Sequence, residues 1–163
     1  MKNEKLQLLA ELGYSVIPCL EDKRPKGAWK EYQTKARTME EVSKLEAPLY
    51  GLVTGYNYLT CIDVDLKVLS TAKEQKEWWD EYLSFLQDNI LDFYDKFVIK
   101  KTKNNGYHIL FKSKRLTTNQ KIAKLKGHNE AIIETRGFGG MVIAYNDGFG
   151  KLDYQDIQFI SDE

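Results

Sequence analysis

The stretch GLVTGYNYLTCIDVD, residues 51–65, decides the fold that this chain is expected to adopt. Residues 49–54 and 58–64 are short runs rich in apolar, β-branched and aromatic side chains, which is typical of strands. The Gly-Tyr-Asn sequence at 55–57 is a turn signal between them. The two runs are therefore predicted to pair as a β-hairpin.

Two aspartates, Asp63 and Asp65, end the second run. Residues two apart on a strand share a face, so their carboxylates are expected to lie side by side while Val64 faces the core. Close carboxylates repel each other and raise one another's pKa, and a bound divalent cation relieves the repulsion. Mg²⁺ or Mn²⁺ suits such ligands, and these ions usually sit between carboxylates and substrate phosphates. The alternative is that the pair opens a turn or caps a helix that starts near Leu69.

The composition limits the classes of protein to which the chain belongs. At 163 residues it is long enough to bury a core and short enough to be one domain. The formal net charge of zero excludes a global basic field, so any polyanion must meet a local patch. No apolar run approaches a membrane span and the first residues lack a signal-peptide pattern, so we expect a cytoplasmic protein. Cys19 and Cys61 are too few for a zinc site and are expected to be buried free thiols.

Apolar periodicity and turn signals predict the remaining elements. Strands outnumber helices, which favours an α+β fold in which helices pack on an antiparallel or mixed β-sheet. The Asn-Asn-Gly turn at 104–106 joins two strands, a glycine-rich turn at 137–140 joins two more as a hairpin, and Pro18 marks a sheet edge or strand end. Helices are expected at residues 3–12, at 39–45 with Thr38 as N-cap, at 71–89, and at 121–126 as a short basic helix. Further strands are expected at residues 14–20, 96–101, 107–112, 131–135 and 141–145.

Three further stretches carry groups that a phosphoryl-transfer metal site needs. His108 follows the Asn-Asn-Gly turn on a predicted strand, and Glu134 and Arg136 share one strand face before the glycine-rich turn. The loop after the first strand carries Lys23, with Trp29 further along. A metal pair needs a third carboxylate, a phosphate contact and a backbone that lets a nucleotide approach. Each residue also has a structural interpretation: His108 as a satisfied histidine, Glu134 as the partner of Arg136, and Trp29 as packing, which we favour for Trp29.

In order along the chain, these motifs resemble the primase–polymerase domain of the archaeo-eukaryotic primase superfamily, in the bifunctional form found in plasmid and phage replication proteins. The resemblance extends from about Leu9 to about Tyr145. The matching motifs are Leu9-Ala10-Glu11-Leu12-Gly13-Tyr14 with Ile17-Pro18, then Lys23, Pro25 and Trp29, then Gly51-Leu52-Val53-Thr54-Gly55 with Cys61-Ile62-Asp63-Val64-Asp65, then Gly106-Tyr107-His108, and finally Glu134 with Arg136, Gly139 and Gly140.

The chain departs from the family pattern in two loops. The family usually has Pro, Ser and Gly where this chain has Lys103-Asn104-Asn105, and a proline pair is common where Tyr145-Asn146 stands. These departures leave open how the protein would hold a template and whether it would select ribonucleotides or deoxyribonucleotides.

The resemblance implies an archaeo-eukaryotic primase-like fold with an RRM-like core, in a single domain of residues 1–163. Residues 1–50 would form an N-terminal unit of helix, strand and loop, residues 51–146 the catalytic core, and residues 147–163 a tail. The implied activity is template-dependent nucleotidyl transfer in DNA replication, meaning primer synthesis, DNA polymerisation or both. It would use a two-metal mechanism with Mg²⁺ or Mn²⁺.

The resemblance also implies roles for individual residues. Asp63, Asp65 and Glu134 would bind the metal ions, and His108 would complete the catalytic set by contacting the phosphates of the incoming nucleotide. The implied nucleotide contacts are His108, Arg136, Lys23 and Gly106.

The implied partners are a single-stranded DNA template and NTP or dNTP substrates. The family's domain is usually followed by a helicase or another replication module, so a helicase domain or subunit is a further expected partner. Basic residues in the middle of the neutral chain are compatible with single-strand binding, although each also suits a solvated charged face. The expected template contacts are Lys101, Lys103, Lys112, Lys114 and Arg115, in a cluster that includes Lys100, Lys121, Lys124 and Lys126.

Two other classes of function stay open. A nuclease would use the same carboxylates to direct water at the nucleic acid instead of a primer hydroxyl. A non-catalytic single-strand nucleic-acid-binding module would use the sheet alone, but the exposed aromatic pair with which RNA-recognition folds stack bases is not evident in the sequence. Only a polymerase requires a triphosphate and releases pyrophosphate, so nucleotide dependence separates it from a nuclease.

Overall fold

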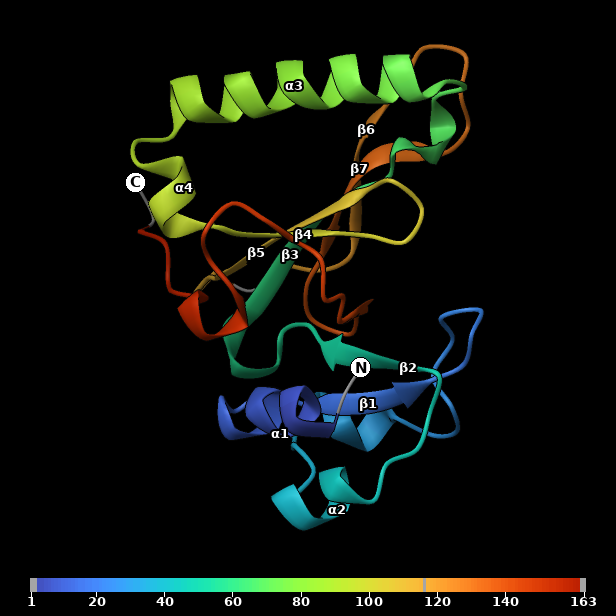
Figure 1. Ribbon diagram of the computed structural model, residues 1–163, viewed down its shortest axis with the longest axis vertical. Coiled ribbons are helices and arrows are strands. Elements are labelled where there is room, and N and C mark those ends of the chain that lie inside the picture. Colours follow the sequence, from blue (N-terminus) through green and yellow to red (C-terminus); the bar gives the residue numbers. More distant parts are fainter. Residues whose placement is uncertain (1–2, 116, 162–163) are drawn as a thin grey trace.

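Two antiparallel β-sheets and a few helices build the molecule, which confirms the α+β fold (Figure 1). The computed structural model describes residues 3–115 and 117–161. The small sheet has the strand order β1-β2-β8, with β1 (Val16–Cys19), β2 (Leu49–Val53) and β8 (Met141–Ile143). The large sheet has the order β6-β7-β3-β5-β4-β9, with β6 (Gln120–Lys124), β7 (Ala131–Arg136), β3 (Leu59–Val64), β5 (Tyr107–Lys112), β4 (Val98–Lys101) and β9 (Gly148–Phe149).

Helix α3 (Ala72–Asn89) lies on the side of the large sheet that faces away from the small sheet (Figure 1). Its buried residues, Trp79 and Leu86 among them, form the apolar stripe that packs on the sheet. A capping box fixes its start, because the Thr71 side chain accepts a hydrogen bond from the backbone N–H of Glu74 at 3.1 Å. The predicted helix at 71–89 is therefore confirmed.

The other helices are short. Thr38 caps α2 as expected, and Pro18 lies in β1, which is an edge strand of the small sheet as its proline predicts. Among the described residues, no helix combines the length and the apolar character needed to cross a membrane. The helices are α1 (Asn3–Glu11), α2 (Met39–Ser43) and α4 (Phe93–Lys96).

The central strands β3 and β5 are buried on both faces. Alternate residues such as Cys61 and Leu110 join a core with α1 and the small sheet, to which Leu52 belongs. The intervening residues, such as Val64 and Ile109, join the core beneath α3. Because a shift of one residue would exchange these two faces, the pairing register of both strands is strongly specified.

The predicted hairpin of residues 49–54 and 58–64 is wrong. β2 pairs with β1 and β8, whereas β3 pairs with β5 and β7 in the other sheet. The connection holds Gly55 at a φ of 83°, Asn57 at 51° and Tyr58 at 62°. Three left-handed residues in this short segment redirect the chain from one sheet to the other instead of folding it back on itself.

The glycine-rich turn at 137–140 is a second crossover between the sheets, so the hairpin predicted there is also wrong. Thr54 joins the two crossovers, because its hydroxyl donates to the carbonyl of Gly137 at 2.6 Å and its backbone N–H donates to that of Gly140 at 3.0 Å. A Cβ on Gly55 would lie 2.6 Å from the Cα of Phe138. The two connections therefore run side by side in close backbone contact.

The basic helix predicted at 121–126 is instead the edge strand β6. It pairs with β7 through an irregular register between Lys121 and Ala123. Of the two large apolar side chains in residues 121–126, Ile122 is 55% exposed and Leu125 packs against the core beneath α3, so the segment offers little apolar surface to stabilise a short helix. Pairing with β7 satisfies its backbone without a broad apolar surface.

The segment after residue 146 contributes to the core. β9 pairs with β4, and Tyr154 is 2% exposed and donates a hydrogen bond from its hydroxyl to the Tyr145 carbonyl at 2.7 Å. Lys100, which the sequence grouped with a basic surface, is buried as well. Its ammonium pairs with Asp153 and lies 4.6 Å from the centre of the Tyr154 ring. The last part of the chain thus closes over a buried charge.

Asp153→Ala is expected to destabilise the protein by about 2–3 kcal/mol, because it leaves the Lys100 ammonium buried without a counter-charge. Lys100→Met should cost less, because it removes the buried charge and leaves only Asp153, whose side chain is 39% exposed and can be hydrated. Urea unfolding of both variants measures the difference. A Lys100→Met protein less stable than the Asp153→Ala protein would contradict this view of the pair.

Candidate active site

A row of polar side chains crosses the large sheet at one level. Asp63 on β3 is the direct cross-strand partner of His108 on β5 and of Glu134 on β7. Lys100 on β4 extends the row beyond His108, and Lys121 on β6 extends it beyond Glu134. Directly opposed residues of antiparallel strands point to the same face. Strand register therefore brings three members of the predicted catalytic set together.

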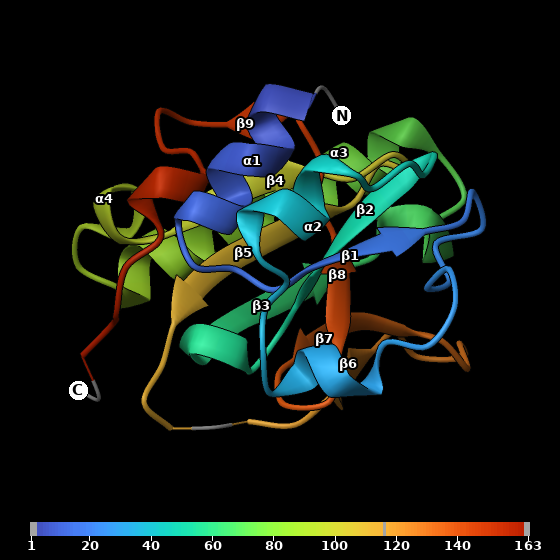
Figure 2. The same ribbon diagram turned by 90° about the horizontal axis from the view of Figure 1, so that it is seen from below.

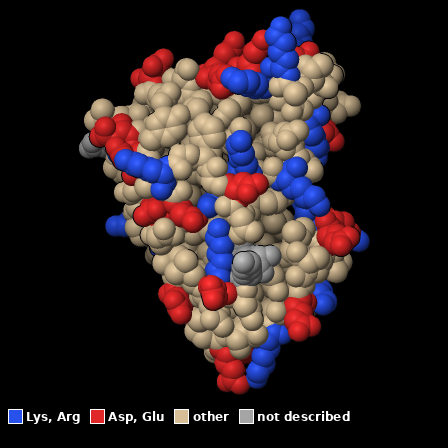
Figure 3. Space-filling model, in the orientation of Figure 1, with Lys and Arg blue, Asp and Glu red and all other residues tan. Residues whose placement is uncertain are grey.

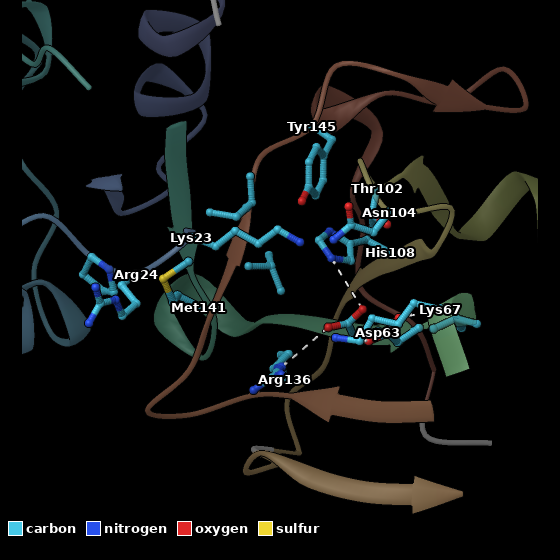
Figure 4. A pocket seen from close by; sticks show the side chains of 15 residues that line it. Lys23, Arg24, Asp63, Lys67, Thr102, Asn104, His108, Arg136, Met141 and Tyr145 are labelled. Atoms are coloured by element: carbon cyan, nitrogen blue, oxygen red, sulfur yellow. Dashed lines mark hydrogen bonds and ion pairs between the residues drawn. The ribbon is translucent and has the colours of Figure 1, made fainter. Parts of the chain in front are cut away.

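Asp63 stands between two nitrogen-bearing side chains (Figure 4). Its Oδ1 lies 3.7 Å from His108 Nε2, and its Oδ2 lies 3.8 Å from Arg136 Nε. Arg136 also donates from Nη2 to Glu134 Oε2 at 2.7 Å. The ion pair of Glu134 with Arg136, which the sequence offered as an alternative to metal binding, is thus formed in this structure.

Asp65 follows β3 and shares its surroundings with Asp63. Both line the same two cavities, while Val64 between them is fully buried, which confirms the predicted alternation. Asp65 also caps the 3-10 helix Leu66–Val68. Its Oδ1 accepts a hydrogen bond from the Lys67 backbone N–H at 3.2 Å, and its Oδ2 lies 3.1 Å from Lys67 Nζ. The turn-forming role offered as an alternative is therefore also present.

Two cavities meet at the aspartates. The first, of about 320 Å³, is lined by His108 and Lys23, and the second, of about 250 Å³, is lined by Glu134. His108 and Glu134 thus lie on opposite sides of Asp63. The residues shared by both cavities are Asp63, Asp65, Lys67 and Arg136.

Burial alters the charge state of the two central groups. Burial raises the pKa of Asp63, with the Asp65 carboxylate adding to the rise and Arg136 opposing it. The pKa of His108 is lowered to about 3, mainly by burial and in addition by the positive charges of Lys23 and Arg136. His108 is therefore neutral at pH 7, with one ring nitrogen as donor and the other as acceptor. Its Nδ1 has no hydrogen-bond partner within residues 3–115 and 117–161.

The donors around Asp63 fit a hard divalent cation. Asp63 and Asp65 are neighbouring carboxylates, and a cation would favour the charged form of Asp63 that burial disfavours. Glu134 is held by Arg136, and in the part of the chain that the structure describes no three His, Cys, Asp or Glu side chains are grouped closely enough to hold a metal ion. Glu134 would have to turn away from Arg136 to become a third ligand.

Lys23 reaches the first cavity from a tight loop after β1. The Leu20 N–H donates to the Arg24 carbonyl at 2.8 Å, the Lys23 N–H donates to the Leu20 carbonyl at 2.9 Å, and Lys23 itself has a φ of 72°. Figure 4 shows its amine directed toward His108. Arg24 also lines this cavity, but its guanidinium is turned away from His108 and Asp63. Arg24 instead donates from Nε to Asp22 at 2.7 Å. The loop thus directs one of two adjacent cations to the site.

Other predicted contacts lie away from the first cavity. Gly106 packs against the Val64 carbonyl, where a Cβ would collide. Lys101 and Lys103 line a separate cavity of about 780 Å³ beside α3, to which Gly106 also belongs. Trp29 packs in the apolar cluster of the small sheet, as favoured from the sequence. The five expected template contacts are therefore divided, because the other three lie at and after the far end of β5: Lys112, Lys114 and Arg115.

The structure adds residues that the sequence did not single out. Thr102, which precedes the predicted turn between β4 and β5, and Asn104, the first residue of that turn, line the first cavity, and the Tyr145 hydroxyl points into it (Figure 4). Lys67 lines both cavities and Glu130 lines the second. The turn signal places Thr102 and Asn104 near His108, but no sequence pattern indicates the position of Tyr145.

The match to known families covers this whole arrangement. A family model for the bifunctional DNA primase/polymerase, N-terminal domain, matches residues 5–154, a range that includes Asp63, His108 and Glu134. No curated protein is a significant match to the chain. Because the matched range is most of the chain, this protein belongs to the family of bifunctional DNA primase/polymerase N-terminal domains.

Proposed function

We propose that this protein catalyses template-dependent nucleotidyl transfer in DNA replication, as a primase, a DNA polymerase or both. The observation that carries the proposal is the row of His108, Asp63 and Glu134, with Asp65 beside it and Lys23 at the same cavity as His108. Membership of the family supports the same class of reaction. The expected substrates are NTPs or dNTPs and a single-stranded DNA template, and a helicase domain or subunit is an expected partner.

The carboxylates would hold Mg²⁺ or Mn²⁺ through Asp63 and Asp65, with Glu134 as the third ligand. Bound ions would lower the pKa of the primer 3′-hydroxyl and neutralise charge on the leaving pyrophosphate. The protein contributes position. β3 is paired on both sides, and the Asp65 N–H donates to the Ile132 carbonyl at 2.9 Å, so the backbone at both aspartates is fixed before substrate binds.

The triphosphate would be held by His108, Lys23 and Arg136. Neutral His108 offers one ring N–H as a hydrogen-bond donor, and a phosphate nearby would raise its pKa and strengthen the bond. Lys23 supplies the positive charge that His108 lacks. Arg136 pairs with Glu134 in the free protein and would exchange that carboxylate for a phosphate as Glu134 turns toward Asp63.

Lys23→Ala is expected to raise the KM for the incoming nucleotide roughly 10-fold with little change in kcat, because it removes one charge-assisted contact worth about 1.5 kcal/mol. Arg24→Ala is the matched control. Arg24 is the adjacent cation and also lines the cavity, but its guanidinium is already paired with Asp22, so the KM of the Arg24→Ala protein should stay near the wild-type value. Steady-state kinetics with each nucleotide measure both variants. Equal increases in KM would mean that general positive charge matters and not a contact from Lys23.

Release of pyrophosphate tests the proposed class of reaction. Wild-type protein would be mixed with primed single-stranded DNA, Mg²⁺ or Mn²⁺ and either dNTPs or NTPs. Pyrophosphate release that requires the template and the metal supports nucleotidyl transfer. Shortening of the DNA without any triphosphate would instead indicate a nuclease, and DNA binding without either reaction would indicate a non-catalytic module.

A further inference from the structure

An exposed aromatic pair lies at the end of the large sheet opposite to Asp63. Tyr58 directly precedes β3, Phe159 lies in the C-terminal segment, and each residue is 45% exposed. Their ring centres are 5.4 Å apart, with 57° between the ring planes. The start of β3 and the red C-terminal segment lie on the same side of the molecule in Figures 1 and 2. Folding thus brings together two rings that are distant in the sequence, and nearly half of the surface of each residue stays exposed instead of packing in the core.

Two lysines flank the pair. Lys112 Nζ lies 5.7 Å and Lys114 Nζ lies 6.0 Å from the centre of the Phe159 ring. Neither lysine forms an ion pair with any residue that the structure describes. The backbone holds this arrangement, because Lys112 donates to the Gln158 carbonyl at 2.8 Å and accepts from the Ile160 N–H at 3.0 Å. Phe159 is therefore fixed beside the end of β5.

Tyr58 is presented to solvent by an unfavourable backbone conformation. Its φ of 62° lies in the left-handed region, which is uncommon for a bulky aromatic residue. Its N–H donates to the Gly55 carbonyl at 3.2 Å, and its carbonyl accepts from the Ser113 N–H at 3.1 Å. Burial of the ring does not offset the strain, since nearly half of the residue stays exposed. Strain that the surrounding structure maintains in this way is concentrated at ligand-binding positions.

We propose that Tyr58 and Phe159 form a stacking platform for unpaired bases of single-stranded nucleic acid, with Lys112 and Lys114 at the adjacent phosphates. Exposed aromatic rings beside basic side chains bind single strands in this way without sequence preference. Charge favours a polyanion here over other partners, because neither lysine has a counter-charge among residues 3–115 and 117–161. Figure 3 shows acidic and basic side chains interspersed over one face of the molecule, as the formal net charge of zero leads one to expect, so such a local site is needed.

The platform lies within reach of the proposed active site, and its link to a template rests on that proposed function. Leu59 pairs with Lys112, and four residues further along β3 Asp63 pairs with His108. At about 3.4 Å per residue the two pairs are about 14 Å apart along β3, whose residues between them are buried or partly buried. A single-strand-binding domain covers roughly 4–16 nucleotides, so one strand that passes over the surface can reach both places. One strand can therefore occupy the platform while another part of it serves as template.

Binding of a labelled oligonucleotide of about 20 thymidines, measured by fluorescence anisotropy without metal or triphosphate, tests the platform. Tyr58→Gly removes the ring and suits the left-handed backbone, so this variant is expected to fold. Tyr58→Gly and Phe159→Ala should each weaken binding about 5- to 150-fold. The matched controls are Asn57→Gly, which changes the neighbouring left-handed residue at a φ of 51°, and Phe85→Ala, which removes a ring that is 59% exposed on α3. Both controls should bind as the wild type does.

The salt dependence of the same measurement tests the lysines. Lys112→Ala and Lys114→Ala should each reduce the slope of the logarithm of affinity against the logarithm of salt concentration by about 0.7. Wild-type affinity in both ring variants would overturn the platform and leave the rings as a contact for a protein. Failure of the wild-type protein to bind the oligonucleotide would overturn it too.

A further variant separates the platform from the proposed catalytic function. The double variant Asp63→Asn/Asp65→Asn should bind the oligonucleotide as the wild type does, although it should no longer extend a primer. Ring-dependent binding by a wild-type protein that extends no primer would sustain the platform and refute the proposed function. Ring-independent binding together with primer extension would refute the platform alone.

Discussion

Asp63→Asn is expected to lower the rate of template-directed primer extension roughly 10²-fold or more, while the protein stays at least as stable as the wild type. Groups that only support a metal ligand already contribute about 10- to 100-fold to affinity or activity, so a direct carboxylate ligand should contribute no less. Asparagine keeps the shape of aspartate and removes its charge. Because burial raises the pKa of Asp63, its charged form is disfavoured in the folded state, and loss of that charge removes a destabilising contribution.

Two measurements on each variant distinguish catalysis from structure. Single-turnover extension with Mg²⁺ or Mn²⁺ gives the rate, and urea unfolding gives the free energy of unfolding. Asp65→Asn should lose activity in the same way, whereas Asp88→Asn, on the exposed side of α3, should change neither quantity. A large loss of stability in Asp63→Asn would mark Asp63 as a structural residue, and a normal rate of extension would remove it from the catalytic set.

Tyr154→Ala is expected to destabilise the protein by about 3–5 kcal/mol, which is the usual cost of removing a buried aromatic side chain. Tyr154 is among the largest fully buried side chains, and it packs in the core that α1, the small sheet and the large sheet share. Tyr154→Phe keeps the ring and loses only the hydrogen bond to the Tyr145 carbonyl, so it should cost about 1 kcal/mol.

Thermal and urea unfolding of the two Tyr154 variants give these values. The comparison tests whether the C-terminal segment is part of the folding unit. If Tyr154→Ala unfolds at the same urea concentration as the wild type, residues 147–161 are not part of the core that the structure describes.

Elements that depend on neighbouring residues were predicted well from the sequence. The capping residue Thr38 and the apolar stripe of 71–89 are local signals, and both helices are present. The Asn-Asn-Gly turn joins β4 to β5 as expected, because its residues tolerate the backbone that a tight turn requires. These local signals place Asp63 near a strand end and His108 just after a turn.

Elements that depend on distant pairing were predicted poorly. The segments 55–57 and 137–140 have the amino-acid composition of tight turns, yet each carries the chain from one sheet into the other. A turn signal predicts only that the chain changes direction, whereas packing in the core determines which strands pair. The same holds for β6, whose pairing with β7 is not visible in its own residues, and for Lys100, whose counter-charge Asp153 lies far along the chain.

The site itself shows the same division. The sequence indicates the types of residue, namely the two aspartates, the histidine and the glutamate. Their meeting depends on the register of β3 with β5 and β7, which no local pattern contains. The resemblance to a family supplied the expectation that these residues meet, because in the family the motifs together form one site. The resemblance did not indicate the ion pair of Glu134 with Arg136, which the residues themselves offered as an alternative, or the exposed pair of Tyr58 and Phe159, which only the structure shows.

The most direct test of the proposed function is incorporation of a single nucleotide opposite a defined template base. A labelled primer on single-stranded DNA would be mixed with Mg²⁺ or Mn²⁺ and one nucleotide at a time, using the wild type and Asp63→Asn/Asp65→Asn. We expect the wild type to lengthen the primer by one nucleotide only with the complementary base, and the double variant to leave it unchanged. A primer that is shortened, that is lengthened without regard to the template, or that is lengthened equally by the double variant would contradict the proposed function.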